Sequence, residues 1–397
     1  MNTSMTRLKQ IVKKYKTDMV AFAQKLIQTP SLSGEEELIA QIVQDKMKKL
    51  GYDDVSTDDY GNIIGYIKGG DAPSLMLNGH LDHVDPGEES TWQYPPFSGE
   101  IVNGIMWGRG AVDIKGPVAA MVYAPAVIKE LHKTPPGDTY VVAPVMEELG
   151  CVGTKHLMTH FKTDLAVVCE PSRNTIRLGN RGGVGLDVTV TGKSVHASIP
   201  AKGLNPHYIV ADFLHKLRTL EMVKHNVFGS SSVAPTLYRT DQSSFNVTPG
   251  EIRLTLDWRT VPNDSLHSIT KRVNSLLQRC IYAQAKGKVD IATFSFKTYT
   301  GISDSHPAIF PSCYLPPEHP FPTQAQKTLS IAFKRNVPFD VWHFITDAGP
   351  MMDAGIPTIG FGPGDEMLAH TNQEHISINQ LTEALLGYAT LCLMDRG

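Results

Sequence analysis

The sequence predicts an α/β fold with a doubly wound, mostly parallel sheet and a smaller α+β domain inserted into it. Over most of the chain, short apolar runs bounded by turn residues alternate with helical stretches, which is typical of parallel strands joined by crossover helices. In the middle of the chain, apolar residues alternate with others that are mostly small or polar, which is typical of half-exposed antiparallel strands. We therefore expect residues 1–181 and 298–397 to form the large domain and residues 182–297 the inserted one.

Four short apolar runs are the predicted buried strands of the large sheet. They are residues 75–77, 140–145, 165–168 and 358–361. Stretches with helical character lie among them, at residues 118–131, 323–334 and 379–394. The inserted domain is predicted from alternation at residues 184–190 and 252–258 and from helical stretches at residues 206–221 and 264–285.

An additional helix is predicted from the residues at its two ends. Ser33 and Glu36 have the spacing of a capping box, in which a serine and an acid three residues later satisfy backbone N–H groups at a helix start. Ile39 and Val43 then lie on one face, and Gly51 is the expected stop. This helix should pack its apolar face on the sheet or on a neighbouring helix.

The composition excludes several classes of partner. The 397 residues, 41% hydrophobic and 19% charged, suffice for two domains with buried cores. A net charge of -3 without runs of like charge argues against nucleic acid. No apolar run approaches the roughly 20 residues of a membrane helix. Five cysteines without C-x-x-C spacing argue against a disulfide framework, and we expect a cytoplasmic protein.

Polar residues follow each predicted strand of the large sheet. Ligand sites of open α/β sheets lie beyond the carboxyl ends of the strands, so these residues should meet. Two histidines and several carboxylates without a thiolate form a donor set for hard or borderline metal ions. Cys169 ends an apolar run and has no histidine spaced to activate it, so we interpret it as core packing. The candidate site residues are His80, Asp82, Asp113, Glu147, Glu148, Glu170 and His370.

Spacing assigns roles to some of these residues. Asp82 lies two residues after His80, where its carboxylate can accept the second imidazole N–H and fix the ring. Asp113 is the candidate to bridge two cations, because a carboxylate can bind a different ion with each oxygen. Glu147 and Glu148 point in different directions at the end of an extended segment, so one can bind metal while the other handles a proton.

Together these segments resemble the M20 family of metallopeptidases, which includes succinyl-diaminopimelate desuccinylase, acetylornithine deacetylase, aminoacylase and glutamate carboxypeptidase. Members carry an H-x-D after a strand, a G-R-G-x-x-D-x-K segment, an E-E pair, a later acidic ligand and a C-terminal histidine. This sequence carries the corresponding residues in the same order, at positions 80–82, 108–115, 147–148, 170 and 370.

The resemblance implies a complete set of roles. Asp113 bridges two divalent ions, Glu148 and His370 complete one ion, and His80 and Glu170 complete the other. Glu147 becomes the general base. Zinc is the expected metal, and the ligand types also permit cobalt or manganese.

The inserted domain resembles the lid and dimerisation domain of the same family. Residues 192–198 look like its signature, in which the histidine, here His196, reaches the active site of the partner subunit in a homodimer. Arg259 resembles an arginine on a lid strand that holds the substrate carboxylate, and Asn246 resembles an asparagine near the substrate. Residues 344–347 depart from a Gly-Gly-Thr-Asp-like run of many relatives, which affects specificity.

The function that this resemblance implies is hydrolysis of the amide bond of an N-acyl amino acid. A dipeptidase or carboxypeptidase acting on short peptides is the alternative within the same chemistry. An alternative of another class is a non-catalytic protein that binds amino-acid derivatives, but such a protein has no need for a base like Glu147 beside a complete ligand set.

Overall fold

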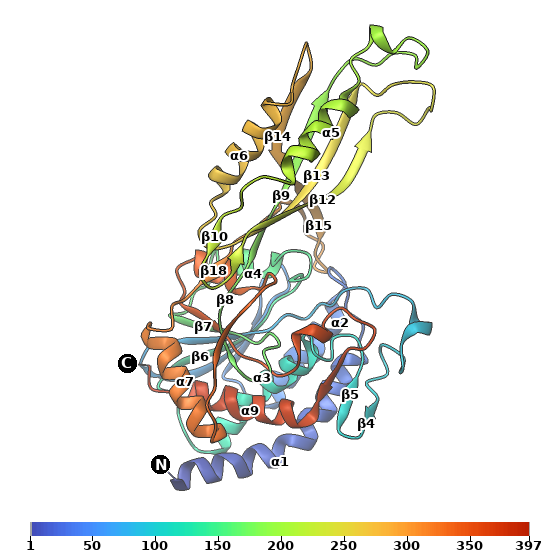
Figure 1. Ribbon diagram of the computed structural model, residues 1–397. Helices are drawn as coiled ribbons and strands as arrows, with labels where there is room; N and C mark the ends of the chain where they lie inside the picture. Colours follow the sequence, from blue (N-terminus) through green and yellow to red (C-terminus); the bar gives the residue numbers. More distant parts are fainter. Residues whose placement is uncertain (1, 397) are drawn as a thin grey trace.

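The computed structural model describes residues 2–396 and places a large α/β body beneath a second, elongated sheet (Figure 1). In this part of the chain the larger sheet has nine strands. Their order is β1 (Asp54–Thr57), β2 (Ile63–Asp71), β6 (Gly137–Ala143), β3 (Leu75–Asn78), β7 (Leu165–Val168), β20 (Thr358–Gly360), β8 (Ile176–Asn180) and β18 (Cys313–Tyr314), with β19 (Phe339–Trp342) also paired to β8.

The four predicted strands form the parallel centre of this sheet. Strand β3 pairs in parallel with β6 on one side and with β7 on the other, and β20 continues the parallel order beyond β7. Strands β1, β2 and β18 pair antiparallel at the edges. The α/β prediction is therefore confirmed, and the complete sheet is mixed because antiparallel strands extend its parallel centre.

Helices cover both faces of the large sheet, as the doubly wound prediction requires. Leu75 and Leu77 of β3 pack into one core, whereas Met76 between them packs into another on the opposite face. The first core contains α1 (Asn2–Ile27), α2 (Glu37–Lys49), α3 (Lys115–Glu130), α7 (Pro320–Phe333) and α9 (Ile378–Cys392). The second contains α4 (Val152–Leu157) and α8 (Ala348–Asp353).

The predicted capping box of α2 is wrong. The helix begins at Glu37, and Glu36 before it makes no side-chain cap. The Ser33 hydroxyl instead donates to Asp82 at 2.6 Å, and the Glu36 carboxylate accepts from the backbone N–H groups of Gly34 and Met146. Both side chains therefore stabilise loops at the sheet edge and leave the helix start uncapped.

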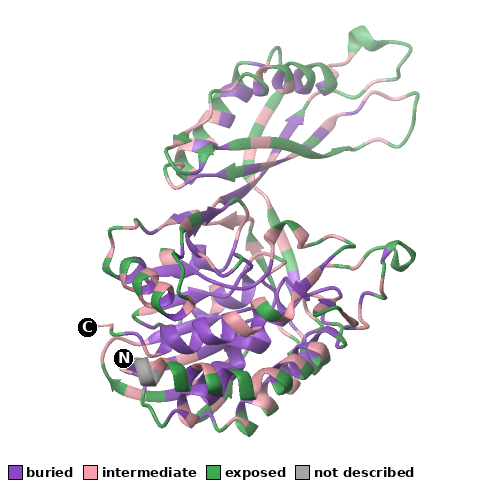
Figure 2. Cartoon of the chain, turned by 60° about the horizontal axis from the view of Figure 1, so that its bottom comes forward, coloured by how far each residue is buried: buried purple, intermediate pink, exposed green. Residues whose placement is uncertain are grey.

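The second sheet is antiparallel and has its own hydrophobic core. Its strands are β12 (Ser232–Thr240), β13 (Glu251–Thr260), β9 (Gly182–Thr191) and β14 (Lys286–Ile291) in that order, with β17 (Ile309–Phe310) also paired to β9. The alternating apolar residues of β9 and β13 pack against α5 (Pro206–Leu217) and α6 (Leu266–Gln278). In Figure 2 buried residues alternate with intermediate and exposed ones in the second sheet and its helices. Strand β12 is largely exposed.

The division of the chain at residues 182 and 297 stays a prediction. Strand β17 lies beyond residue 297 and still adds to the second sheet. Short elements complete the fold: β4 (Ile101–Val102), β5 (Ile105–Trp107), β10 (Lys224–His225), β11 (Gly229–Ser230), β15 (Thr293–Lys297), β16 (Ser303–Pro307) and β21 (His375–Ser377), with 3-10 turns at Glu89–Thr91, Pro200–Lys202 and Glu366–Leu368. Within residues 2–396, no helix has both the length and the apolarity to cross a membrane.

The five cysteines are buried and make no disulfide. Cys169 is fully buried in the main core, and burial raises the pKa of its thiol. A protonated, inaccessible thiol is a poor nucleophile and metal ligand, which agrees with the interpretation of Cys169 as core packing.

Candidate metal centre

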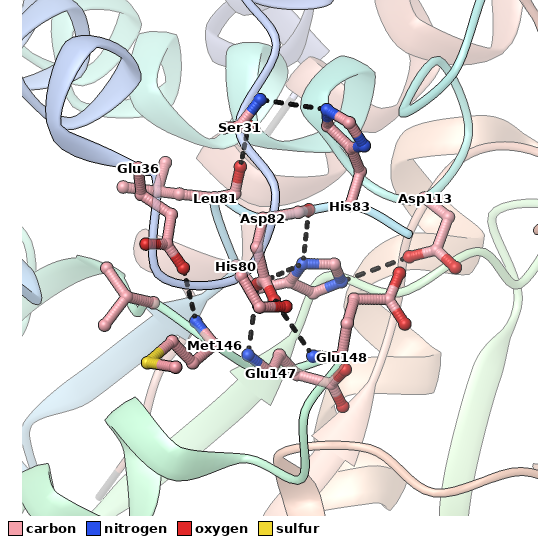
Figure 3. Close-up of polar contacts among 12 residues, drawn as sticks. Ser31, Glu36, His80, Leu81, Asp82, His83, Asp113, Met146, Glu147 and Glu148 are labelled. Atoms are coloured by element: carbon pink, nitrogen blue, oxygen red, sulfur yellow. Dashed lines mark hydrogen bonds and ion pairs between the residues drawn. The ribbon is translucent and has the colours of Figure 1, made fainter. Parts of the chain in front are cut away.

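The carboxyl ends of the central parallel strands bring the predicted metal ligands to one place. Strand β3 leads into the His80–Asp82 segment, β6 leads into the Glu147–Glu148 pair, and β7 ends two residues before Glu170. Asp113 comes just before α3, and His370 follows β20 by a turn in which its own backbone is left-handed, with φ of 62°. The arrangement of the labelled residues is visible in Figure 3.

Asp113 lies between the two histidines. Its Oδ1 atom is 3.1 Å from Nε2 of His80, and its Oδ2 atom is 3.1 Å from Nε2 of His370. A second carboxylate approaches each histidine: Glu170 Oε1 lies 3.3 Å from Nε2 of His80, and Glu148 Oε1 lies 3.0 Å from Nε2 of His370. Each histidine thus lies beside two carboxylates, and Asp113 is common to both groups of three candidate ligands.

The chemistry of this donor set fits divalent metal ions. Ligand atoms of His80, Asp113 and Glu148 all lie within 4.8 Å of one another. Burial and the nearby charge of Asp113 together raise the pKa of Glu170 to about 7. Burial and the charge of Asp113 likewise raise the pKa of Glu148. Crowded, buried carboxylates of this kind need cations to stay charged, and two imidazoles with three carboxylates suit borderline ions such as zinc.

Asp82 connects the histidine to the glutamate pair. Its Oδ1 atom lies 3.3 Å from Nδ1 of His80 and accepts the backbone N–H of Glu147 at 3.0 Å. Its Oδ2 atom accepts the backbone N–H of Glu148 at 3.1 Å and the Ser33 hydroxyl. Figure 3 shows His80 between Asp82 and Asp113, so Nδ1 is engaged and Nε2 points toward the candidate ligands.

Glu374 holds the loop that carries Asp113, and the sequence analysis did not identify it. Its Oε1 atom accepts the backbone N–H groups of Val112 and Asp113 at 3.0 and 3.1 Å, and its Oε2 atom pairs with Arg109 at 2.5 Å. Both charged side chains are buried. The available signal was Arg109, because a buried arginine in a glycine-rich segment requires a carboxylate partner.

Glu36 is the other supporting residue that sequence reasoning misassigned. Its Oε1 atom accepts the backbone N–H of Met146 at 3.0 Å, next to Glu147 in the chain. Burial raises the pKa of Glu36 to about 8, and the nearby charge of Asp82 acts in the same direction. The residue therefore anchors the loop that ends β6.

Glu147 and Glu148 have different neighbours. Atoms of Glu147, Cys151 and Asp347 lie within 4.8 Å of one another, and the Cys151 thiol donates to Glu147 at 3.5 Å. Burial raises the pKa of Glu147 well above its usual value. A carboxyl group with a raised pKa can accept a proton and release it again near neutral pH.

A cavity of about 470 Å³ opens onto these residues. Asp113, Glu147, Glu148, Glu170 and His370 line its polar side. Arg259, which extends from β13 of the second sheet, also lines it and pairs with Asp257 at 2.9 Å. Its apolar wall is formed by Leu149, Phe310, Phe344, Ile345 and Ala369.

His196 and Asn246 do not line this cavity. Gly182 at the start of β9 pairs with Thr260, whereas Thr191 at its end pairs with Glu251. At about 3.3 Å per residue, the two ends of this strand are roughly 30 Å apart. His196 lies just beyond the far end, and the main chain there bridges to Val247, the neighbour of Asn246. The structure therefore places both residues away from the candidate metal ligands of the same chain.

Comparison with known proteins identifies the family of the chain. A family model described as peptidase family M20/M25/M40 matches residues 76–393. The uncharacterized protein YgeY of Escherichia coli K12 is 27% identical over 96% of this chain and 95% of its own length. Succinyl-diaminopimelate desuccinylase of Blochmanniella floridana is 29% identical over 66% of this chain and 73% of its length. N-formyl-4-amino-5-aminomethyl-2-methylpyrimidine deformylase of Bacillus subtilis is 27% identical over 96% of each chain.

Solved structures show the same fold. The aminopeptidase PepT of Bacillus cereus superimposes with a TM-score of 0.74 at 18% identity, over 95% of this chain and 98% of its own. YXEP of Bacillus subtilis, described as a dinuclear metal-binding peptidase of the M20 family, gives 0.73 at 14% identity, over 96% of this chain and 98% of its own. With a family match over most of its length and metal-ligand groups gathered at one sheet edge, the chain belongs to peptidase family M20/M25/M40 and is a metal-dependent hydrolase.

Proposed function

We propose that the protein hydrolyses the amide bond of an N-acyl amino acid at a centre of two divalent ions that share Asp113. The observation that carries this proposal is the position of the Asp113 carboxylate, with one oxygen 3.1 Å from each histidine. His80 and Glu170 would hold one ion with Asp113, and His370 and Glu148 the other. Zinc suits these ligands, and cobalt and manganese are the alternatives. When bound, such ions supply an activated water and polarise the scissile carbonyl.

Glu147 is the proposed general base and acid. It lines the cavity beside the candidate ligands, and burial raises its pKa, which suits a group that takes a proton from the attacking water. The same carboxyl group can then pass the proton to the amine that leaves. Its neighbour Glu148 lies 3.0 Å from His370 and is assigned to metal binding.

Arg259 is the proposed partner of the substrate carboxylate. It extends from the second sheet into the cavity lining and presents a guanidinium that can bind a carboxylate with two hydrogen bonds. Its pair with Asp257 orients the side chain, which is 44% exposed and therefore accessible. Substrate would lie between Arg259 and the ions, with its acyl group against the apolar wall of the cavity.

A dipeptidase is the second candidate within this chemistry. It would need an acidic group for the free ammonium of a peptide. Among the described residues that line the cavity, Glu366 is the acidic one to which we assign no part in metal binding or proton transfer. Glu366 is already paired with Arg177 at 2.9 Å. We therefore favour substrates with a blocked amine, for which no such acidic partner is needed. The non-catalytic alternative is not supported, because the chain is an M20 hydrolase.

We further propose that two copies form a homodimer in which His196 acts in the partner's site. Two observations support it: the roughly 30 Å length of β9 separates His196 from its own cavity, and β12 is an exposed edge strand of the second sheet. An open edge can pair with the same strand of a second copy. Large apolar side chains are exposed on and beside this strand, at Leu237, Tyr238 and Phe245. Asn246 follows Phe245 directly and would approach the substrate from the same side.

The proposed reaction is tested by a hydrolysis panel of N-acetyl amino acids, N-succinyl amino acids and dipeptides with the metal-loaded protein. We expect an N-acyl amino acid to be the best substrate. Glu147→Gln should keep its metal and lose turnover by roughly 10²–10⁴, the factor for removal of a positioned base, whereas exposed Glu35→Gln should change nothing. Full metal content with normal turnover would remove Glu147 from the mechanism, and loss of metal would make it a ligand.

Asp82→Ala should weaken metal binding by roughly 10- to 100-fold, because Asp82 orients His80 and holds the glutamate pair. Competition with a chelator measures the affinity. Asp85→Ala is the matched control, since Asp85 is exposed and its carboxylate accepts a hydrogen bond from Gly87 in its own loop. An unchanged affinity in Asp82→Ala would show that the ligands are held by other contacts.

Arg259→Ala should lower kcat/KM for a carboxylate substrate by roughly 10- to 100-fold, which corresponds to about 1.5–3 kcal/mol for a charged hydrogen bond. The carboxamide of the same substrate should be affected much less. Arg253→Ala is the control, because Arg253 lies on the same strand and its side chain is 56% exposed. An equal loss for both substrates would mean that Arg259 supports the second sheet and does not recognise the carboxylate.

The action of His196 in the partner's site is tested by mixing His196→Ala subunits with Glu147→Gln subunits. Each variant should be nearly inactive alone. His196→Ala loses a hydrogen-bond donor to the transition state, which costs about 2.7–4 kcal/mol, and Glu147→Gln loses the general base. At random equal mixing, half of the dimers are mixed and each has one complete site, so activity should return to about one quarter of wild type. No recovery after proven subunit exchange would place His196 outside the partner's site.

A further inference from the structure

Three side chains of metal-ligand type meet beside α4, outside the lining of the catalytic cavity. Asp58 lies in the turn between β1 and β2, His156 lies in the last turn of α4, and His160 follows four residues later. Each offers one ligand atom, and these atoms all lie within 4.8 Å of one another. None of the three belongs to the cavity described above.

The Asp58 carboxylate is held in a fixed position. Its Oδ1 atom accepts the backbone N–H groups of Tyr60, Gly61 and Asn62, each at 3.0 Å, and its Oδ2 atom accepts Nδ2 of Asn62 at 2.7 Å. Only 8% of the side chain is exposed. A carboxylate that is already oriented loses little further freedom when it binds an ion, which favours binding.

The distance between Asp58 and His160 suits an ion between them. Nε2 of His160 is 3.8 Å from Oδ2 of Asp58, which is too long for a hydrogen bond. Two ligands of a tetrahedral ion with bonds of about 2.0–2.1 Å are separated by roughly 3.4 Å. A small movement of the His160 side chain, which is 43% exposed, closes that difference.

His156 lies in the last turn of α4, and His160 lies in the turn that follows the end of this helix. The backbone N–H groups of His160 and Phe161 donate to the carbonyl of Leu157, and this tight turn keeps the two histidines close together. The ring of His156 stacks on Tyr60 with centroids 3.7 Å apart and an interplanar angle of 1°. The centroid of the His160 ring is 5.0 Å from that of the His156 ring. Thr159 lies 3.2 Å from Nδ1 of His160, which leaves Nε2 for a ligand bond.

We propose that Asp58, His156 and His160 form a third metal site, separate from the catalytic pair, for a borderline divalent ion such as Zn²⁺. Two imidazoles and one carboxylate are a donor set for such an ion. Water completes the coordination, because the side of the cluster that His160 occupies is open to solvent.

The third ion would stabilise the segments on either side of the catalytic glutamates. The Asn62 side chain, which holds Asp58, also donates to the carbonyl of Gly153 at 2.9 Å and accepts from the backbone N–H of Val145 at 3.0 Å. Val145 precedes the Glu147–Glu148 pair and Gly153 follows it. An ion that joins Asp58 to α4 therefore reinforces this connection, and the site has a structural role.

The test counts zinc ions per chain by mass spectrometry after equilibrium dialysis against Zn²⁺. The His160→Ala substitution should remove one ion per chain from the otherwise wild-type protein. It should also remove one ion from the Asp113→Ala variant, which lacks the proposed shared ligand of the catalytic pair. Zn²⁺ should still raise the Tm of Asp113→Ala, and this rise should disappear when His160→Ala is added to that variant. His215→Ala is the control, because His215 is an exposed histidine of α5.

Equal zinc counts with and without His160, or an equal loss in His215→Ala, would overturn the third site. His156→Gln provides a second variant with a smaller change of shape, and it should also lose one ion. Failure of the two-ion catalytic centre has a different signature, since Asp113→Ala would then bind as much zinc as wild type. The two proposals can therefore fail separately.

Discussion

The position of the Asp113 carboxylate between two histidines is the constraint on which the rest of the site depends. A loop before α3 carries this residue, and Glu374, 261 residues later, binds its backbone N–H. Strand β21, which follows Glu374, pairs with β5 in a small sheet and so brings the two segments together. The pair between Arg109 and Glu374 neutralises charges that would otherwise be costly to bury.

The large sheet supplies the other candidate ligands on a rigid base. Strands β3, β6 and β7 are hydrogen-bonded neighbours in parallel register, so their carboxyl ends present His80, the glutamate pair and Glu170 along one edge. Together with Asp113 these side chains place several carboxylates in a buried space, where burial raises the pKa values of Glu147, Glu148 and Glu170. Divalent cations at this place would offset the charge of the buried carboxylates. Conflict of this kind between stability and local chemistry is characteristic of functional sites.

Much of this could be predicted from the sequence, because the relevant signals are local. Apolar runs marked the central strands, and the polar residues after them had to meet once those strands were parallel. The partners of Glu36 and Glu374 could not be predicted, since they are distant in the chain; Arg109 indicated a carboxylate partner but not which one. Ser33 and Glu36 have the spacing of a capping box. In the structure Ser33 instead donates to Asp82, and Glu36 accepts from the backbone N–H of Met146. His196 and Asn246 were identified only by resemblance, and in one chain they lie far from the cavity.

The most direct test of the shared Asp113 is a crystal structure of the zinc-loaded protein, with anomalous scattering recorded on both sides of the zinc absorption edge. We expect two anomalous peaks per site, roughly 3.5–4 Å apart, with one oxygen of Asp113 bound to each ion. His80 and Glu170 should bind one peak, and His370 and Glu148 the other. A single peak at this site, or two peaks with Asp113 bound to only one of them, would contradict the proposal that Asp113 is shared by two ions.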